Sequence, residues 1–273
     1  MREIPIGELA AVVDDPFLHH HVDPTRPGAR AWVHGWAAVV DGASGRQGWR
    51  GPAFSCLGPP EDLGPLMAAI AATGEAPVRV SAEHTSAADL PDSWRPVERL
   101  DWHWMWTAAA PEQPTRDGVE VVDLDESDAA DRDAVEAVLD AGYADSFARP
   151  GVPGAEAWLG VTHRGTLAGV GVLIRQPSGA GLIRAVTVLP EHRGHGLARV
   201  LSAALAHRAV AGGNGTATLG VYTTNAPAVR VYERLGFRTA HTFVAGPTAL
   251  GAADADAAQA SASPSTSAST PSR

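Results

Sequence analysis

Residues 186–198 constrain the fold more than any other stretch, because an apolar run leads through Arg193, Gly194 and Gly196 directly into a long alanine-rich segment. The pattern predicts a β-strand, a glycine-rich turn and an α-helix. Glycines let main-chain N–H groups approach a ligand, and the unpaired amides and positive dipole end of a helix attract anions. A fixed cation such as Arg193 strengthens that attraction. The segment therefore predicts an anion-binding loop, with a plain strand-to-helix turn as the alternative.

A second segment, residues 225–237, follows at the distance of one helix and one strand. Pro227 near the start and Gly236 just beyond the end frame a short helix that carries Tyr232. Together the two segments resemble the GNAT superfamily of acyl-CoA-dependent N-acetyltransferases. The first segment matches the family's Arg-x-x-Gly-x-Gly/Ala loop at Arg193, Gly196 and Ala198. The second matches the family's Asn-x-x-Ala-x-x-x-Tyr-x-x-x-Gly-Phe pattern at Asn225, Ala228, Tyr232, Gly236 and Phe237.

The resemblance implies acetyl-CoA as co-substrate, no metal, and a pyrophosphate held by the glycine loop. It also implies that the backbone of residues 186–188 lies beside the pantetheine arm, near a bulge that separates this strand from the next. Asn225 would contact that arm or order the loop, and its alternative is an N-cap. The residues expected to bind the coenzyme are Val186, Thr187, Val188, Arg193, Gly194, His195, Gly196, Leu197, Ala198 and Asn225.

Tyr232 is the expected catalytic residue, because a phenol can give a proton or a hydrogen bond to the departing thiolate. Its alternative is a core tyrosine that packs the helix on the sheet. Residues 182–189 contain no acidic side chain, although many members of the family carry a glutamate there. Arg184 lies within residues 182–189. Two roles are open for it: it pairs with an acidic group of the substrate, or it is a solvated strand residue near the edge of the sheet. The remaining candidates for a general base are Glu156, Asp145, His163 and Tyr143. The alternative for each of them is an exposed polar residue without a catalytic role.

Length and composition indicate two modest α/β domains and a tail. The chain has 273 residues, a formal net charge of −10, a single cysteine, Cys56, and no lysine. The charge opposes binding to nucleic acid or anionic membranes and favours cationic substrates. The lone cysteine fits a buried strand residue in a reducing compartment. With no apolar run near about eighteen residues and no secretory signal, we expect a cytoplasmic protein, as a monomer or homodimer.

The carboxyl-terminal half is expected to form a complete GNAT domain at 117–246, with a mixed sheet in the order β-α-α-β-β-β-α-β-α-β. Residues 1–110 are expected to form a degenerate GNAT-like or accessory α/β domain, joined by a Pro-rich linker at 108–117, and residues 247–273 a disordered tail. In the GNAT domain we expect strands at 119–124, 157–163, 167–175, 182–188, 217–221 and 237–244, and helices at 128–141, 197–211 and 226–235.

The amino-terminal part repeats the same succession in weaker form. Strands are expected at 31–40, 49–57, 78–82 and 97–107, with a helix at 62–72. Residues 59–64 would replace the glycine loop, but Glu61 and Asp62 would repel a pyrophosphate there, which predicts that this half has lost the coenzyme site. Trp102, Trp104 and Trp106 alternate on the last strand and are read as core or domain interface.

Two functions remain open from the sequence. The first is an N-acetyltransferase acting on an amine, which can be a small molecule or a peptide. The second is a non-catalytic acyl-CoA-binding or substrate-sensing protein of the same fold. A metal site at residues 19–21 is disfavoured, because consecutive histidines do not share one ligand face.

Overall fold

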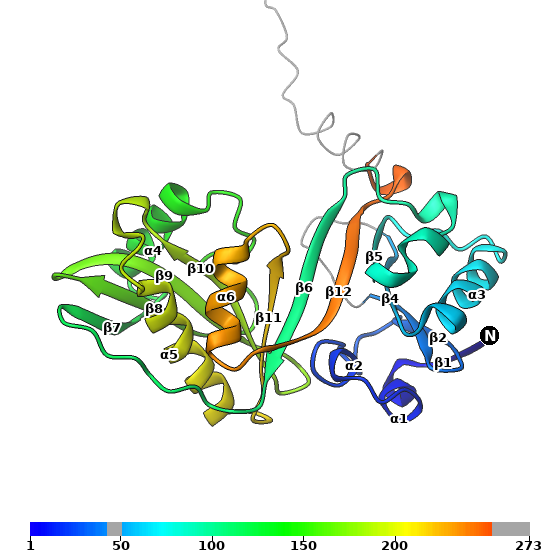
Figure 1. Cartoon of the computed structure of the whole chain (residues 1–273), viewed down its shortest axis with the longest axis horizontal. Helices are drawn as coiled ribbons and strands as arrows, with labels where there is room; N and C mark the ends of the chain where they lie inside the picture. The colour runs from blue at the N-terminus through cyan, green and yellow to red at the C-terminus, as the bar shows by residue number, and fades with distance from the viewer. Residues whose placement is uncertain (43–50, 253–273) are drawn as a thin grey trace, which may run out of the picture. The chain divides into compact units, whose positions relative to one another are not determined.

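A computed structural model describes residues 1–42 and 51–252, and its contacts divide the chain into two compact units (Figure 1). The first unit contains Met1–Arg2, Trp32–Arg99 and the chain from Val244 onward; the second contains Glu3–Ala31 and Leu100–Phe243. This division differs from the boundaries 1–110 and 117–246 expected from the sequence. The segment Glu3–Ala31 and strand β6 (Leu100–Thr107) pack with the second unit, because their partners lie there.

The second unit is a mixed sheet in the order β12-β6-β11-β10-β9-β8-β7, to which β12 contributes its residues up to Phe243. Strands β10 and β11 pair in parallel, and the pairs β7·β8, β8·β9, β9·β10 and β6·β11 are antiparallel. The α/β class and the mixed sheet are confirmed. The elements that follow β6 are β7 (Val119–Leu124), α4 (Ala129–Gly142), β8 (Ala155–His163), β9 (Thr166–Arg175), β10 (Gly181–Val188), α5 (Leu197–Ala211), β11 (Ala217–Tyr222), α6 (Ala226–Arg234) and β12 (Arg238–Pro247).

Helices cover both faces of this sheet. Neighbouring residues of β10 join different clusters: Ile183 packs with α5 and α6, whereas Leu182 packs with α4. This separation follows from the strand, since successive side chains point to opposite faces. In place of the second helix of the expected order β-α-α-β, residues 143–154 form turns.

Strand β6 lies between β11 and β12 in the second unit. It pairs with β11 along its length, from Thr107 opposite Ala217 to Trp102 opposite Tyr222. Trp104 is fully buried and meets the Phe17 ring edge-on at 5.4 Å. The interpretation of the tryptophan stripe as core is therefore confirmed for Trp104.

The segment before β6 in this unit contains short helices. Asp15 caps α2 by accepting from the main-chain N–H of Phe17 and pairs with His241 at 3.1 Å.

Burial, followed by the charge of Arg184, lowers the pKa of His21 to about 3. Within residues 1–42 and 51–252 no group of three His, Cys, Asp or Glu side chains could hold a metal ion. The elements here are β1 (Arg2–Pro5), η1 (Ile6–Glu8), α1 (Leu9–Val12) and α2 (Pro16–His20).

The first unit repeats part of this topology, with strand order β2-β3-β4-β5-β12. The single strand expected at 31–40 is a hairpin, because Gly35 adopts a φ of +53° and turns the chain. Cys56 is fully buried in β4, as expected, and burial raises the pKa of its thiol. The elements are β2 (Arg30–His34), β3 (Ala37–Asp41), β4 (Ala53–Leu57), α3 (Pro60–Ala71), β5 (Arg79–Glu83), η2 (His84–Asp89) and η3 (Asp92–Trp94).

The carboxylate of Asp62, in the first turn of α3, bonds the turn between β2 and β3. The main-chain N–H of Trp36 donates to Asp62 Oδ2 at 2.8 Å, and a Cβ on Gly35 would lie 2.2 Å from the same oxygen. Strand β4 pairs with β5 from Ala53 to Cys56 and with β3 without a register shift. That this half has lost the coenzyme site stays a prediction.

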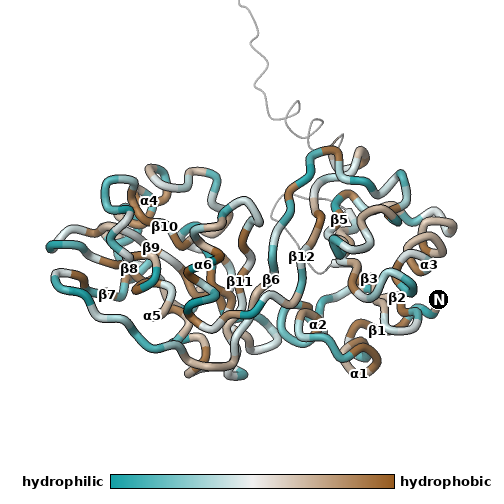
Figure 2. The backbone as a smooth tube through the Cα atoms, viewed as in Figure 1, coloured by the Kyte–Doolittle hydropathy of each residue, from teal (hydrophilic) through white to brown (hydrophobic). Residues whose placement is uncertain are grey.

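The chain after β12 begins with structured residues. Thr248, which the sequence assigned to the tail, is fully buried and donates through Oγ1 to Pro77 O at 2.6 Å. Residues 249–252 are helical, and residues 43–50 and 253–273, which include most of the expected tail, lie outside the described residues. Figure 2 shows hydrophobic segments in helices and strands and hydrophilic ones in many connecting loops. No helix in the described part of the chain has the length and apolar character needed to cross a membrane.

Candidate coenzyme site

The strand, loop and helix predicted for residues 186–198 are present. Strand β10 ends at Val188, a short 3₁₀ turn covers Pro190–His192, and α5 begins at Leu197. Gly194 and Gly196 adopt φ values of +82° and +75°, and Gly196 is the N-cap of α5. Left-handed glycines therefore carry the chain into a helix whose first N–H groups have no partner within the helix.

Strand β10 is interrupted in its middle. In its pairing with β9 the register shifts between Arg184 and Thr187, and Ala185 adopts a φ of +54°. Its parallel pairing with β11 extends from Gly181 only to Ile183. The expected bulge is confirmed, and beyond Ile183 strands β10 and β11 no longer form a ladder.

The residues after the bulge face different helices. Val186 and Val188 pack against the cluster that contains α5, whereas Thr187 is buried beneath the end of α4. A Cβ on Gly142 would lie 2.4 Å from Thr187 Cγ2. Helix α4 thus ends directly on the bulged strand, at a distance that only glycine permits.

The cation of the loop, Arg193, forms a hydrogen bond to the last residue of β10. Arg193 is exposed, and its Nε donates to Val188 O at 3.1 Å. His195 is exposed, Leu197 is buried in the core and Ala198 is half-buried. The structure thus places residues 186–188 and 193–198 on one continuous strand–loop–helix segment.

Arg116 also lies at the loop, although the sequence analysis placed it in a linker. A Cβ on Gly196 would lie 2.8 Å from Arg116 Nη2. A main-chain bond from Val119 N to Arg116 O, 3.1 Å long, closes a turn in which Gly118 has a φ of +69°. The Asp117-Gly118 pair was a turn signal in the sequence, but nothing local indicated where that turn would lie.

Tyr232 lies between α6 and α5. Its ring is 9% exposed and approaches Phe237 at 5.9 Å, within the cluster that contains α5. Burial raises the pKa of Tyr232 to about 12, and the neighbouring Ser202 hydroxyl on α5 lowers it by less. The phenol is therefore neutral at physiological pH and available as a donor.

Asn225 caps helix α6. Its side-chain oxygen accepts from the main-chain N–H of Ala228 at 3.2 Å, and Pro227 occupies the first turn. The N-cap interpretation is confirmed, and contact with the coenzyme remains a prediction.

Comparisons with known proteins agree with this geometry. Residues 158–244 match the family model described as FR47-like protein. A GCN5-related N-acetyltransferase from Kribbella flavida is similar in structure, with a TM-score of 0.51, 18% identity, and coverage of 81% of this chain and 89% of that one. The chain has the GNAT fold. A GCN5-related N-acetyltransferase from Sphaerobacter thermophilus gives a TM-score of 0.52 and 19% identity over 80% of this chain and 79% of that one. The search of curated proteins found no match.

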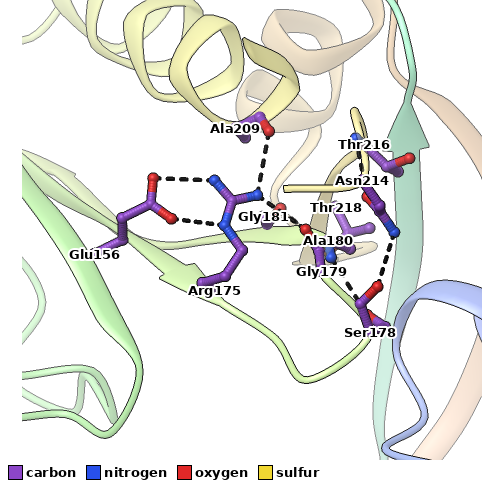
Figure 3. Close-up of polar contacts among 10 residues, drawn as sticks. All are labelled: Glu156, Arg175, Ser178, Gly179, Ala180, Gly181, Ala209, Asn214, Thr216 and Thr218. Carbon is purple, nitrogen blue, oxygen red and sulfur yellow. Dashed lines mark hydrogen bonds and ion pairs between the residues drawn. The ribbon is translucent and has the colours of Figure 1, made fainter. Parts of the chain in front are cut away.

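Within the GNAT unit, one candidate for the general base has a structural role. Arg175 forms a two-point ion pair with Glu156, at 2.6 and 3.0 Å, and also donates to Gly179 O and Ala209 O (Figure 3). The hydrogen bond from Arg175 is the main cause that lowers the pKa of Glu156. Because a paired carboxylate of low basicity is a poor base, we no longer consider Glu156 a candidate.

The other candidates are dispersed over the GNAT unit. Tyr143 is the C-cap of α4, and Asp145 is exposed in the turn after it. His163 lies at the end of β8 beside the glycine loop, where its ring is 4.8 Å from that of His195. Arg184 is exposed just before the bulge, and its charge lowers the pKa of His21.

Proposed function

We propose that this chain is an acetyl-CoA-dependent N-acetyltransferase that acetylates an amine. The observation that carries the proposal is the parting of β10 from β11 after Ile183, at a bulge that leads into the glycine loop and α5. Main-chain groups of β10 that no longer pair with β11 would bond the amides of an extended pantetheine arm. The loop amides and the dipole of α5 would hold the pyrophosphate.

In the reaction, the amine nitrogen attacks the thioester carbonyl, the C–N bond forms and the C–S bond breaks. A main-chain N–H of β10 after the bulge would stabilise the oxygen that gains charge. The amine loses one proton, and the thiolate gains one. No acidic residue on β10 is available to take that proton. We infer that the amine binds neutral or transfers its proton through water.

The role of Tyr232 follows from its acidity. A thiol has a pKa of about 8.5, so a phenol with a pKa of about 12 is the weaker acid. Complete transfer of the phenolic proton to the thiolate is therefore unfavourable. Tyr232 would instead donate a hydrogen bond to sulfur as negative charge develops there.

One observation favours the alternative of a non-catalytic acyl-CoA sensor. Strand β10 carries Arg184 and no carboxylate. A screen separates the two functions: the protein is incubated with acetyl-CoA and a panel of small amines, amino acids and peptides, and free thiol is measured. Thiol release that depends on one amine class supports the enzyme. Tight coenzyme binding without turnover on any amine would support the sensor.

The glycine loop is tested by Gly196→Glu. The new side chain would project toward Arg116, crowding the loop and placing a carboxylate among the groups expected to hold the coenzyme's phosphates, so we expect calorimetry to detect no binding of coenzyme A. Because Gly196 has a φ of +75°, the substitution also strains the backbone. Gly74→Glu is the matched control, since Gly74 has a φ of +89° in open space in the first unit and should retain full affinity. Undiminished affinity in a folded Gly196→Glu protein would show that the loop does not hold the coenzyme.

A further inference from the structure

A cavity of about 510 Å³ borders the glycine loop and includes Arg116, Asp117, His163, Gly194 and His195 in its lining. All of these residues belong to the second unit. The cavity shares Gly194 and His195 with the loop, so a group bound there would be adjacent to a pyrophosphate on the loop amides. The proposed mechanism gives no role to Arg116 or His163, and His195 has so far been only a member of the coenzyme loop.

The position of Arg116 is fixed by the sheet. Val119 pairs with His163 across strands β7 and β8, and Val119 N donates to Arg116 O. The same turn accepts a bond from Arg164 N to Gly118 O at 2.7 Å. Two main-chain hydrogen bonds and a strand register therefore fix the backbone at Arg116, and its exposed side chain lies against Gly196.

Two of the residues that line the cavity, His163 and His195, are histidines. His163 Nδ1 lies 3.1 Å from His192 Nδ1, so one of the two rings donates a hydrogen bond to the other. Burial, then the charges of His195, Arg164 and His192, lower the pKa of His163. An anion beside these rings would favour their protonated forms.

The charges around His163 are mostly positive or can become so. Arg164 lies on the β8–β9 turn, Arg116 on the turn before β7, and Arg193 on the loop with His192 and His195. The opposing carboxylates are Asp117 in the cavity lining and Glu191 in the 3₁₀ turn. In a chain with a net charge of −10, such a cationic cluster points to an anionic ligand.

We propose that Arg116, His163 and His195 form a second phosphate subsite, which binds the 3′-phosphate of coenzyme A while the loop amides bind its pyrophosphate. This proposal rests on the proposed function. A phosphomonoester carries up to two negative charges near neutral pH, because its second pKa is about 6, and arginine is well suited to bind it. Positive charge from the histidines would then be recruited on binding.

The test compares coenzyme A with 3′-dephospho-coenzyme A, which lacks only the group in question. Calorimetry with the full chain should show that the natural protein binds coenzyme A about tenfold more tightly than the dephospho form. Arg116→Gln should reduce the affinity for coenzyme A about tenfold and leave the affinity for the dephospho form unchanged. Arg132→Gln is the control, since Arg132 is an exposed arginine on α4, which covers the other face of the sheet, and should change neither affinity.

A second measurement addresses the histidines. Titrations at pH 7 in buffers of different ionisation enthalpy should show greater proton uptake for coenzyme A than for the dephospho form, and His163→Gln should remove part of this difference. Equal affinity of the natural protein for both ligands would overturn the subsite. Equal weakening of both ligands by Arg116→Gln would also overturn it, because the arginine would then serve the pyrophosphate. Failure of both ligands to bind would instead refute the proposed function.

Discussion

Tyr232 is held by the packing of α6 on α5, so its chemistry depends on its surroundings as much as on its hydroxyl. The buried ring keeps the phenol neutral, with a pKa of about 12, and Ser202 is its polar neighbour. A neutral phenol in a site of low polarity can stabilise a developing thiolate without giving up its proton. Its contribution should therefore show in turnover and not in coenzyme binding.

Tyr232→Phe removes one hydroxyl from the transition state. We expect kcat to fall about 10²-fold while coenzyme affinity stays nearly unchanged. Tyr222→Phe serves as the control, because that tyrosine is exposed at the end of β11. The measurement is kcat with an active amine, beside the melting temperature of each variant. Equal kcat for the natural protein and Tyr232→Phe would assign this tyrosine to packing alone.

At single residues, the sequence predicted chemistry well where a motif fixed the local geometry. An N-cap was one of the two roles considered for Asn225, and Gly194 and Gly196 were expected as loop glycines, which the structure places at positive φ. Arg116 escaped prediction because its approach to Gly196 depends on the pairing of β7 with β8. A contact between segments far apart in the chain leaves no trace in the pattern around either residue.

At the scale of elements, the approach of α4 to β10 positions the bulged strand. Gly142 ends the helix against the buried Thr187, whose hydroxyl donates to Ala185 O at 3.1 Å. The left-handed Ala185 is kept by this packing, although that conformation costs an L-residue roughly 1–2 kcal/mol. Helix, strand and bulge therefore depend on one another.

Gly142→Ala tests this dependence. The added methyl would overlap Thr187 Cγ2, and we expect the free energy of unfolding to fall by about 1–3 kcal/mol in urea denaturation. Adding Thr187→Ser removes Cγ2 while keeping the hydroxyl, so the double variant should regain part of the loss. If the change in free energy of unfolding of the double variant equals the sum of the two single changes, these groups do not touch.

Strongly periodic elements were predictable, since α5 has the expected bounds 197–211 and β7 the expected bounds 119–124. The interruption of β10 was not, because no residue pattern marks Ala185 as left-handed. The bulge was expected only from the family resemblance. Gly35 divides the strand expected at 31–40 into a hairpin, a turn that the apolar residues on both sides concealed.

At the scale of the whole molecule, each unit contains a strand that the linear order of the sequence assigns to the other half. Strand β6 precedes the linker but pairs with β11, and β12 enters the first unit at Val244. Boundaries drawn from composition at 110 and 117 could not reveal this arrangement. A strand's hydrophobic pattern specifies which face is buried but not which neighbour it pairs with.

The end of the chain gives a test at this scale. Removing residues 253–273 should leave stability nearly unchanged, because their composition offers little apolar surface to bury. Ending the chain at Gly246 should lower the free energy of unfolding by about 1–3 kcal/mol, since Thr248 then no longer bonds the carbonyl groups of Pro77 and Val78. Melting temperatures of the two truncated chains would decide, and equal values would contradict the role of Thr248.

The position of β6 between β11 and β12 also sets an order of events during synthesis on the ribosome. Residues 100–107 emerge long before 217–222, the segment with which they pair, and 238–243 emerge later still. The nascent strand must therefore wait, with both of its edges unpaired, while the intervening elements are made. Chaperones that shield exposed aromatic segments would act on this chain during that interval, before β12 closes the sheet.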